Sequence, residues 1–203
     1  MTTRQLRVLV SCEFSGRVRS CFTERGWDAW SCDILPTEIP GQHFIGDVTP
    51  HLQENWDLLI AFPPCTRLCN SGVRWLAERN LWEEMRQGAE FFKKHLETKI
   101  KYVAVENPIM HKYAREIIKV PYTQVIQPWQ FGHGETKATC LWLKNLPRLL
   151  RTDVVETRRQ AVHLMSPGPE RSKLRSTTYW GIAKAMAQQW GTFIELKEQQ
   201  NAR

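Results

Sequence analysis

The stretch "WDLLIAFPPCTRLCNSG", residues 56–72, joins a short apolar run to two prolines and a cysteine. Four to eight apolar residues in a row are typical of a strand that is buried on both faces of a sheet. The prolines stiffen the backbone and remove two donors, so Cys65 is expected to be held in a fixed place just past the strand. Cys65 is then either a small packing residue or a nucleophile aimed into a cleft.

The same kind of run recurs along the chain and alternates with helical patterns. Strands are expected at residues 6–12, 27–33, 43–47, 56–62 and 101–108, and later at 122–127 and 139–143. Helices are expected between Gly16 and Gly26, from Val73 to Leu96, and over 179–190. This alternation predicts an α/β fold, with a mostly parallel twisted sheet and helices on both faces.

Polar groups follow several of these strands. In a doubly wound sheet, ligands bind outside the carboxyl ends of the strands. The groups expected there are Cys12–Gly16, Asp33, Asp47, Pro64–Cys65 and Glu106–Asn107. An acid after the second strand suits ribose hydroxyls, and one after the third suits an adenine amino group, so we expect an adenosine-containing cofactor. Each acid alone is equally well explained as a helix cap or strand terminator.

Cys65 and Glu106 are the candidate chemical groups. A thiolate at a strand end could attack an electrophilic carbon, and a carboxyl at the neighbouring strand end could transfer a proton. Glu106 taken alone could be only a salt-bridge partner. Cys69, four residues after Cys65, is interpreted as structural.

Composition and charge favour a globular nucleic-acid-binding protein. The 203 residues fit one domain, with 42% hydrophobic and 24% charged residues, and the formal charge of +7 suggests a polyanionic partner. Basic side chains gather in a loop-rich segment, residues 144–175. This segment is either a nucleic-acid-binding surface or an ordinary solvated face of the protein. The candidate nucleic-acid contacts are Arg148, Arg151, Arg158, Arg159, Arg171, Lys173 and Arg175.

The chain gives no sign of export or of metal binding. Its first residues lack a signal-peptide layout and no apolar run is long enough to cross a bilayer, so we expect a cytoplasmic protein without a membrane partner. The six cysteines show neither CxxC pairing nor Cys/His ligand spacing. Free thiols are therefore expected, without disulfides or a metal site.

Three motifs, in this order, resemble those of the cytosine-5 DNA methyltransferases: "FSG" at 14–16, "PPC" at 63–65 and "EN" at 106–107. The longer stretches "CEFSGRVRSCF", "SCDILP", "FIGDV" and "QFGHGETKATCLWLKNLP" are most similar to small phage and prophage members. The resemblance extends from about Leu6 to Trp190. It implies a Rossmann-like class I methyltransferase fold, S-adenosylmethionine as cofactor and DNA as partner, in a bacterial or phage-infected cell.

The resemblance also implies roles for individual residues. Cys65 would add to C6 of a flipped-out cytosine and Glu106 would hydrogen-bond N3 and the exocyclic amine, so that C5 takes the methyl group. Asn107 and Lys137 complete the implied catalytic set. Phe14 would stack on adenine, Asp33 would bind the ribose and Asp47 the adenine amine. The full implied cofactor set is Phe14, Ser15, Gly16, Asp33, Ile34, Asp47 and Pro64.

The chain departs from that family in ways that leave alternatives open. Lys137 and Thr139 stand where the family has two arginines, and Cys69 stands where it has a serine. Residues 144–175 are too few for a separate target-recognition domain, so base reading would be minimal, come from loops, or be borrowed from a protein partner. Two alternatives follow. One is a different C5-pyrimidine modification by the same Cys/Glu pair, with another group or a free nucleotide. The other is a catalytically silent module that binds DNA or protein.

Overall fold

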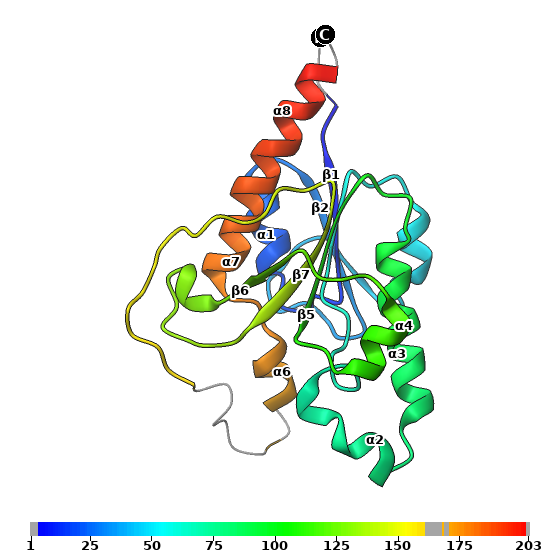
Figure 1. Ribbon diagram of the computed structural model, residues 1–203. Helices are drawn as coiled ribbons and strands as arrows, with labels where there is room; N and C mark the ends of the chain where they lie inside the picture. The colour runs from blue at the N-terminus through cyan, green and yellow to red at the C-terminus, as the bar shows by residue number, and fades with distance from the viewer. Residues whose placement is uncertain (1–3, 161–167, 169–170, 202–203) are drawn as a thin grey trace.

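The computed structural model describes residues 4–160, 168 and 171–201 (Figure 1). The strands are β1 Arg7–Ser11, β2 Asp28–Asp33, β3 His43–Ile45, β4 Leu58–Ala61, β5 Tyr102–Pro108, β6 Gln124–Ile126 and β7 Thr139–Lys144. The helices are α1 Arg17–Glu24, α2 Arg74–Glu78, α3 Trp82–Leu96, α4 Lys112–Ile118, α6 Arg171–Ser176, α7 Trp180–Ala185 and α8 Gly191–Asn201. Short 3-10 turns are η1 Thr49–Gln53, η2 Asn70–Gly72 and η3 Pro128–Gln130, and a π-helical turn, η4 Met186–Trp190, joins α7 to α8.

The strands form one sheet in the order β3-β2-β1-β4-β5-β7-β6. The pairs from β3 to β5 are parallel, whereas β7 runs antiparallel to both of its neighbours. This order, with one reversed strand inserted beside β5, is that of the Rossmann-like class I methyltransferase fold. The predicted fold class is confirmed.

Two hydrophobic cores lie on the two faces of the sheet, because side chains alternate along each strand. Val8 and Val10 of β1 pack with α1 and with the α7–α8 helix, whose Trp190 is fully buried. Leu9 of the same strand points the other way, into a core with Phe92 of α3. Figure 1 shows α1, α7 and α8 on one side of the sheet and α3 and α4 on the other.

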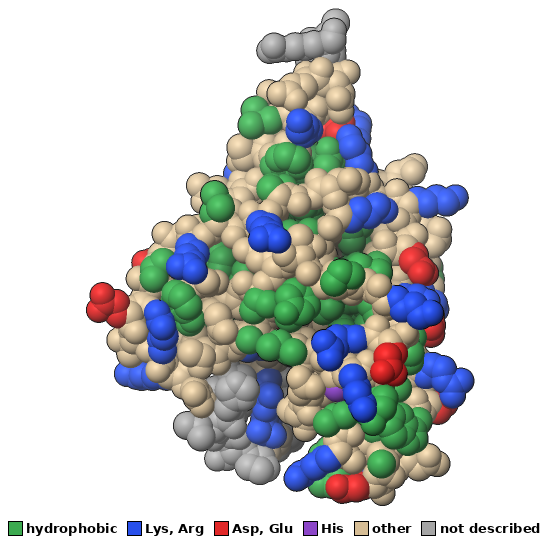
Figure 2. All heavy atoms as spheres, viewed as in Figure 1, with side chains coloured by type: hydrophobic (Ala, Val, Ile, Leu, Met, Phe, Trp, Pro, Cys, Tyr) green, Lys and Arg blue, Asp and Glu red, His purple; other side chains and the backbone are tan. Residues whose placement is uncertain are grey.

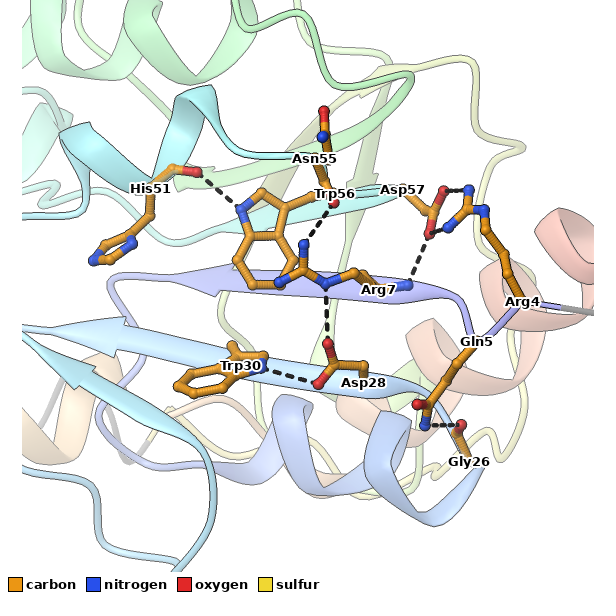
Figure 3. Close-up of polar contacts among 10 residues, drawn as sticks. All are labelled: Arg4, Gln5, Arg7, Gly26, Asp28, Trp30, His51, Asn55, Trp56 and Asp57. Atoms are coloured by element: carbon orange, nitrogen blue, oxygen red, sulfur yellow. Dashed lines mark hydrogen bonds and ion pairs between the residues drawn. The ribbon is translucent and has the colours of Figure 1, made fainter.

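The amino edge of the sheet is closed by an ion-pair network around Arg7 (Figure 3). The Arg7 guanidinium donates to Asp28 Oδ2 at 3.0 Å and lies 4.2 Å from the Trp56 ring, while its backbone N–H donates to Asp57 Oδ2 at 2.8 Å. These contacts tie β1 to β2 and to the start of β4. The charges at this edge therefore hold the amino ends of three neighbouring strands together.

Two helix predictions need correction. The single helix expected over 73–96 is broken into α2 and α3, because Asn80 adopts a left-handed backbone with φ 52°. Asparagine tolerates this left-handed conformation. The conformation ends α2 before α3 begins, although the apolar spacing of the sequence continues through it. The last helix continues past Trp190 through the 11 residues of α8. The sequence analysis also did not predict α4.

No helix among the described residues is both long and apolar enough to cross a bilayer.

Candidate active site

The turn that carries Cys65 is fixed to the end of β5. The Asn107 side chain is fully buried, and its Nδ2 donates to the Pro63 carbonyl at 2.9 Å. The Cys65 carbonyl then accepts the N–H groups of Leu68 and Cys69 at 2.9 and 3.0 Å, which closes a tight turn. Through this contact Asn107, predicted as catalytic, holds the double-proline turn.

Glu106 lies at the end of β5, the strand that pairs in parallel with β4 just before Cys65. Burial of its carboxyl raises its pKa, while the Lys137 charge and a hydrogen bond with Thr139 act in the opposite direction. The charges of Glu106 and Lys137 also act on the Cys65 thiol. The structure thus brings the predicted residues Cys65, Glu106 and Lys137 into one electrostatic group.

A small cleft opens beside Glu106. Its lining is Phe62, Glu106, Lys137, Thr139, Ser176, Thr178, Tyr179, Ile182 and Met186. Lys137 Nζ donates to the Arg175 carbonyl at 2.7 Å, which closes one side of the cleft with the end of α6. Strand ends and the α6–α7 link therefore form its walls, although these segments lie far apart in the sequence.

The side chains of Cys65 and Cys69 interact and shift one another's pKa in opposite directions. Cys69 Sγ also lies 3.1 Å from Ser71 Oγ and interacts with the N–H groups of Ser71 and Gly72. This set of donors lowers the pKa of Cys69 to about 5, and the partner thiol Cys65 has its pKa raised.

The turn after β1 is built around Gly16, whose φ of 72° favours glycine. An added Cβ there would lie 2.6 Å from Arg19 Nη2. Below the turn, the buried Glu13 accepts from Ser15 Oγ at 2.7 Å and from the Val18 N–H at 3.0 Å through Oε1. Among the described residues, nothing hydrogen-bonds its buried Oε2, and burial raises the pKa of Glu13.

The remaining predicted cofactor residues lie around this turn with different exposure. Phe14 is buried, Ile34 is 78% exposed and Pro64 is exposed. Asp33 is half-buried at the end of β2, and burial raises its pKa. Asp47 is exposed and accepts from the Thr49 N–H at 2.9 Å, which lowers the pKa of Asp47.

Arg19 holds the loop that covers the turn. Its side chain is buried, and it donates to the carbonyls of Ile39 and of Gln42, the latter at 3.1 Å. In this way α1 fixes residues 37–42 beside Phe14, whose carbonyl accepts the N–H of Glu38 at 2.9 Å.

We expect Arg19→Met to lower the free energy of unfolding by about 1–3 kcal/mol, because hydrogen bonds from a charged donor are lost while the site stays enclosed. Urea denaturation with an unchanged m-value would measure this loss. Arg148→Met, at an exposed side chain, is the matched control and should stay within about 0.5 kcal/mol of wild type. Equal effects of the two substitutions would show that other contacts hold the loop.

The basic segment 144–175 does not form one surface in the structure, and its residues 161–167 and 169–170 lie outside the described part. Arg151 and Arg158 lie 5.5 and 4.0 Å from the Trp129 ring, beside η3. Lys173 instead pairs with Glu38 at 2.7 Å and lies 5.4 Å from the Phe14 ring. On the face seen in Figure 2, Lys and Arg side chains are spread widely rather than gathered in one strip.

These positions divide the seven predicted nucleic-acid contacts into two groups. Those exposed on the loop are Arg148, Arg151, Arg158 and Arg159, and those half-buried on α6, next to the glycine turn and the cleft, are Arg171, Lys173 and Arg175. Lys173 of α6, whose Nζ lies 5.4 Å from the Phe14 ring, is therefore on the glycine-turn side of the site. Sequence order alone could not separate the groups.

Sequence reasoning missed three features of the site. Glu13 is an acid at the end of an apolar strand, which is a signal for a buried polar role. Thr139 was noted only as a replaced arginine, yet its hydroxyl contacts Glu106. Cys69 was interpreted as structural, although its spacing of four from Cys65 suits contact within one turn.

The sheet order, glycine turn and strand-end groups together define a chain with the class I methyltransferase fold. No protein-family model matches the chain, and no curated protein matches it. Among solved structures, it is similar to the Entamoeba histolytica methyltransferase EhMeth, with 13% identity, a TM-score of 0.47, and coverage of 82% of this chain and 61% of that one. It is also similar to the S. pombe Dnmt2 methyltransferase, with 16% identity, a TM-score of 0.45, and coverage of 81% and 55%.

A third similar structure is an rRNA methylase from Escherichia coli, with 16% identity, a TM-score of 0.38, and coverage of 69% of this chain and 57% of that one. The chain therefore spans about three fifths or less of the length of these three proteins. The assignment of the fold class rests on the strand order itself.

Proposed function

We propose that this chain is an S-adenosylmethionine-dependent methyltransferase that acts at C5 of cytosine in DNA through a covalent bond between Cys65 and C6. The observation that carries the proposal is the electrostatic grouping of Cys65, Glu106 and Lys137 at the ends of adjacent strands. A sulfur nucleophile and a carboxyl that can donate a proton are the two groups that addition to a pyrimidine ring requires.

The residues at the glycine turn fit S-adenosylmethionine. The buried Glu13 Oε2 lacks a hydrogen-bond partner among the described residues, which leaves it available to accept a hydrogen bond from a ligand. Phe14, Gly16 and Asp33 would hold the cofactor, with Asp33 at a strand end that suits ribose hydroxyls. When bound, S-adenosylmethionine supplies an activated methyl group.

The chain's own side chains would prepare the base. Burial raises the pKa of Glu106 and so favours the protonated carboxyl, which would donate its proton toward N3 of the ring. Lys137 and Thr139 line the cleft together with that carboxyl and would orient it. Bond formation between Cys65 Sγ and C6 then makes C5 nucleophilic.

DNA would be bound mainly through its backbone. The target base must leave the duplex to reach the cleft, at a cost of about a few kcal/mol. The exposed arginines of residues 148–159 could contribute phosphate contacts, which weaken as salt rises. A site with few base-reading groups implies weak sequence preference unless a protein partner supplies it.

Incubation of the protein with DNA and methyl-tritiated S-adenosylmethionine, followed by digestion and mass analysis of nucleosides, tests the proposal. We expect label in 5-methyl-2′-deoxycytidine, and none with Cys65→Ala. Parallel reactions with RNA and with free dCMP separate the possible pyrimidine substrates. Label at another atom of cytosine, or only in RNA or nucleotide, would contradict the proposed substrate.

A further inference from the structure

We propose that two tryptophans, each flanked by two arginines, hold the DNA backbone on either side of the flipped base. The α2 cluster is Trp75 with Arg74 and Arg79, and the η3 cluster is Trp129 with Arg151 and Arg158. This inference rests on the proposed function, in which DNA is the substrate. It adds a second contact surface, on α2, to the basic loop that the sequence suggested.

The α2 cluster is built on one short helix. The guanidinium carbons of Arg74 and Arg79 lie 4.2 and 4.1 Å from the centre of the Trp75 ring. Both arginines are exposed and the tryptophan is half-buried, so the ring fixes where the two charges meet the solvent. A guanidinium that lies on an aromatic ring still presents N–H groups at its edge, where a phosphate can accept them.

The η3 cluster joins two segments of the chain. The guanidinium carbons of Arg158 and Arg151 lie 4.0 and 5.5 Å from the centre of the Trp129 ring. Both arginines are exposed and belong to the loop after β7. The Val155 N–H donates to the Trp129 carbonyl at 2.9 Å, and this bond holds the loop against η3. The second cluster therefore repeats the arrangement of the first with residues from elsewhere in the sequence.

Both segments carry more positive than negative charge. Residues 74–79 contain two arginines and one acid, Glu78. Residues 148–159 contain four arginines and two acids, Asp153 and Glu156. A polyanion matches this surplus, and guanidinium groups suit phosphate because they can donate two N–H groups to it at once.

The two clusters lie on opposite sides of Glu106 at the carboxyl edge of the sheet, where the strand order is β4-β5-β7-β6. Strand β6 is antiparallel to β7, which is antiparallel to β5, so β6 ends at the same edge as β5. Trp129 follows the end of β6, and Trp75 follows the Cys65 turn after β4. Three strand spacings separate β4 from β6, about 14 Å, which equals the axial rise of about four nucleotides. This span suits one DNA strand that meets both clusters with the target base between them.

Each cluster is also tied to a wall of the site. Gly72, just before α2, packs so closely on the Cys65 turn that an added Cβ would lie 2.8 Å from the Thr66 carbonyl oxygen. On the other side, Gln127 Oε1 accepts the N–H of the cleft residue Lys137 at 2.8 Å, next to η3. Figure 1 shows α2 on one side of α6 and the loop after β7 on the other. A phosphate held at either cluster is therefore fixed relative to the cleft.

Fluorescence anisotropy with labelled duplex DNA, measured over a range of salt concentrations, tests the proposal. We expect Arg79→Gln and Arg158→Gln each to weaken binding about tenfold, because a hydrogen bond from a charged donor is lost. Each change should also reduce the slope of log affinity against log salt by about 0.9, the value for one phosphate contact.

Lys197→Gln is the matched control. Lys197 is an exposed cation 5.9 Å from the Phe193 ring, on α8, which Figure 1 shows at the opposite end of the molecule from α2 and α6. Its variant should keep the wild-type affinity and salt slope. If Arg79→Gln and Arg158→Gln bind DNA no more weakly than Lys197→Gln, the proposal is overturned.

A second pair of variants tests the rings themselves. Trp75→Leu and Trp129→Leu keep every arginine, so we expect an unchanged salt slope and binding about twofold to fivefold weaker, the effect of losing an exposed cation–π contact. Wild-type affinity in both would overturn the role of the rings. The arginine variants retain both rings, so their result stands even if a leucine variant is less stable in urea.

Methyl transfer separates this inference from the proposed function. At saturating DNA, Arg79→Gln and Arg158→Gln should keep the wild-type kcat, with KM for DNA raised about tenfold, because they weaken binding and leave the chemistry intact. A wild type that methylates DNA while all variants match it in KM would overturn the role of the clusters alone. A wild type that neither binds nor methylates DNA would contradict the proposed function as well.

Discussion

The Cys65→Ala variant is expected to form no covalent complex with DNA that contains 5-fluorocytosine, and to transfer methyl groups at less than about a thousandth of the wild-type rate. The physical reason is that alanine has no atom to bond C6, so C5 never becomes nucleophilic. In the wild type, the fluorine blocks release of the adduct. The covalent complex between protein and DNA should therefore accumulate. Denaturing electrophoresis with labelled DNA measures the complex directly.

Cys21→Ala is the matched control for this experiment. Cys21 is a buried cysteine of α1 that packs in the core with Phe22, outside the cleft lining. Its variant should trap DNA as the wild type does. If Cys65→Ala traps as well as Cys21→Ala, Cys65 is a packing residue and the covalent mechanism is wrong.

Glu106→Gln is expected to reduce methyl transfer by about 10²–10⁴-fold, the usual contribution of a positioned acid. The same change should raise the thermal stability at neutral pH. A buried carboxyl with a raised pKa binds its proton more tightly in the folded than in the unfolded chain. The protonated Glu106 carboxyl therefore contributes its full stability at pH values below the pKa of Glu106 in the unfolded chain. This contribution is lost as the pH rises through the pKa of Glu106 in the folded chain.

Melting temperature measured against pH tests the stability half of this prediction. Glutamine does not ionise, so Glu106→Gln should melt above wild type at pH 7–8, by about 2–4 °C for each kcal/mol gained, and the difference should vanish below pH 4. Glu116→Gln, at an exposed side chain of α4, should show no such dependence. A gain of the same size at pH 4 and pH 8 would show that ionisation of Glu106 is not its cause.

The sequence patterns that predicted secondary structure correctly are those of segments that must be buried in the folded protein. The apolar runs at 6–12, 56–62 and 101–108 became β1, β4 and β5 because each is buried on both faces, which leaves few other solutions for such a run. The helix over 73–96 was wrong because its apolar spacing continues through Asn80, whereas the backbone reverses there. Periodicity describes which face is buried and does not reveal one left-handed residue.

The candidate site residues also divide into those that the sequence placed correctly and those that it did not. The predicted strand ends correctly placed Cys65, Glu106 and Asp33 at one edge of the sheet, because the carboxyl ends of its parallel strands meet at that edge. The position of α6 was not predictable: Lys173 and Arg175 were grouped with the basic loop, yet they reach Phe14 and Lys137 respectively. Such contacts join residues more than thirty positions apart, and no local pattern encodes them.

The sequence by itself determined the α/β class, the edge of the sheet where chemistry is expected, and the identity of the thiol and carboxyl there, because hydrophobic patterning and chain direction are local properties. Only the tertiary structure decided the reversed β7, the lack of a hydrogen-bond partner for Glu13 Oε2 among the described residues, and the contacts that lower the pKa of Cys69. Each of these depends on burial and on donors brought together from separate segments. Proton affinity at a site is set by that enclosure, which exists only after the chain has folded.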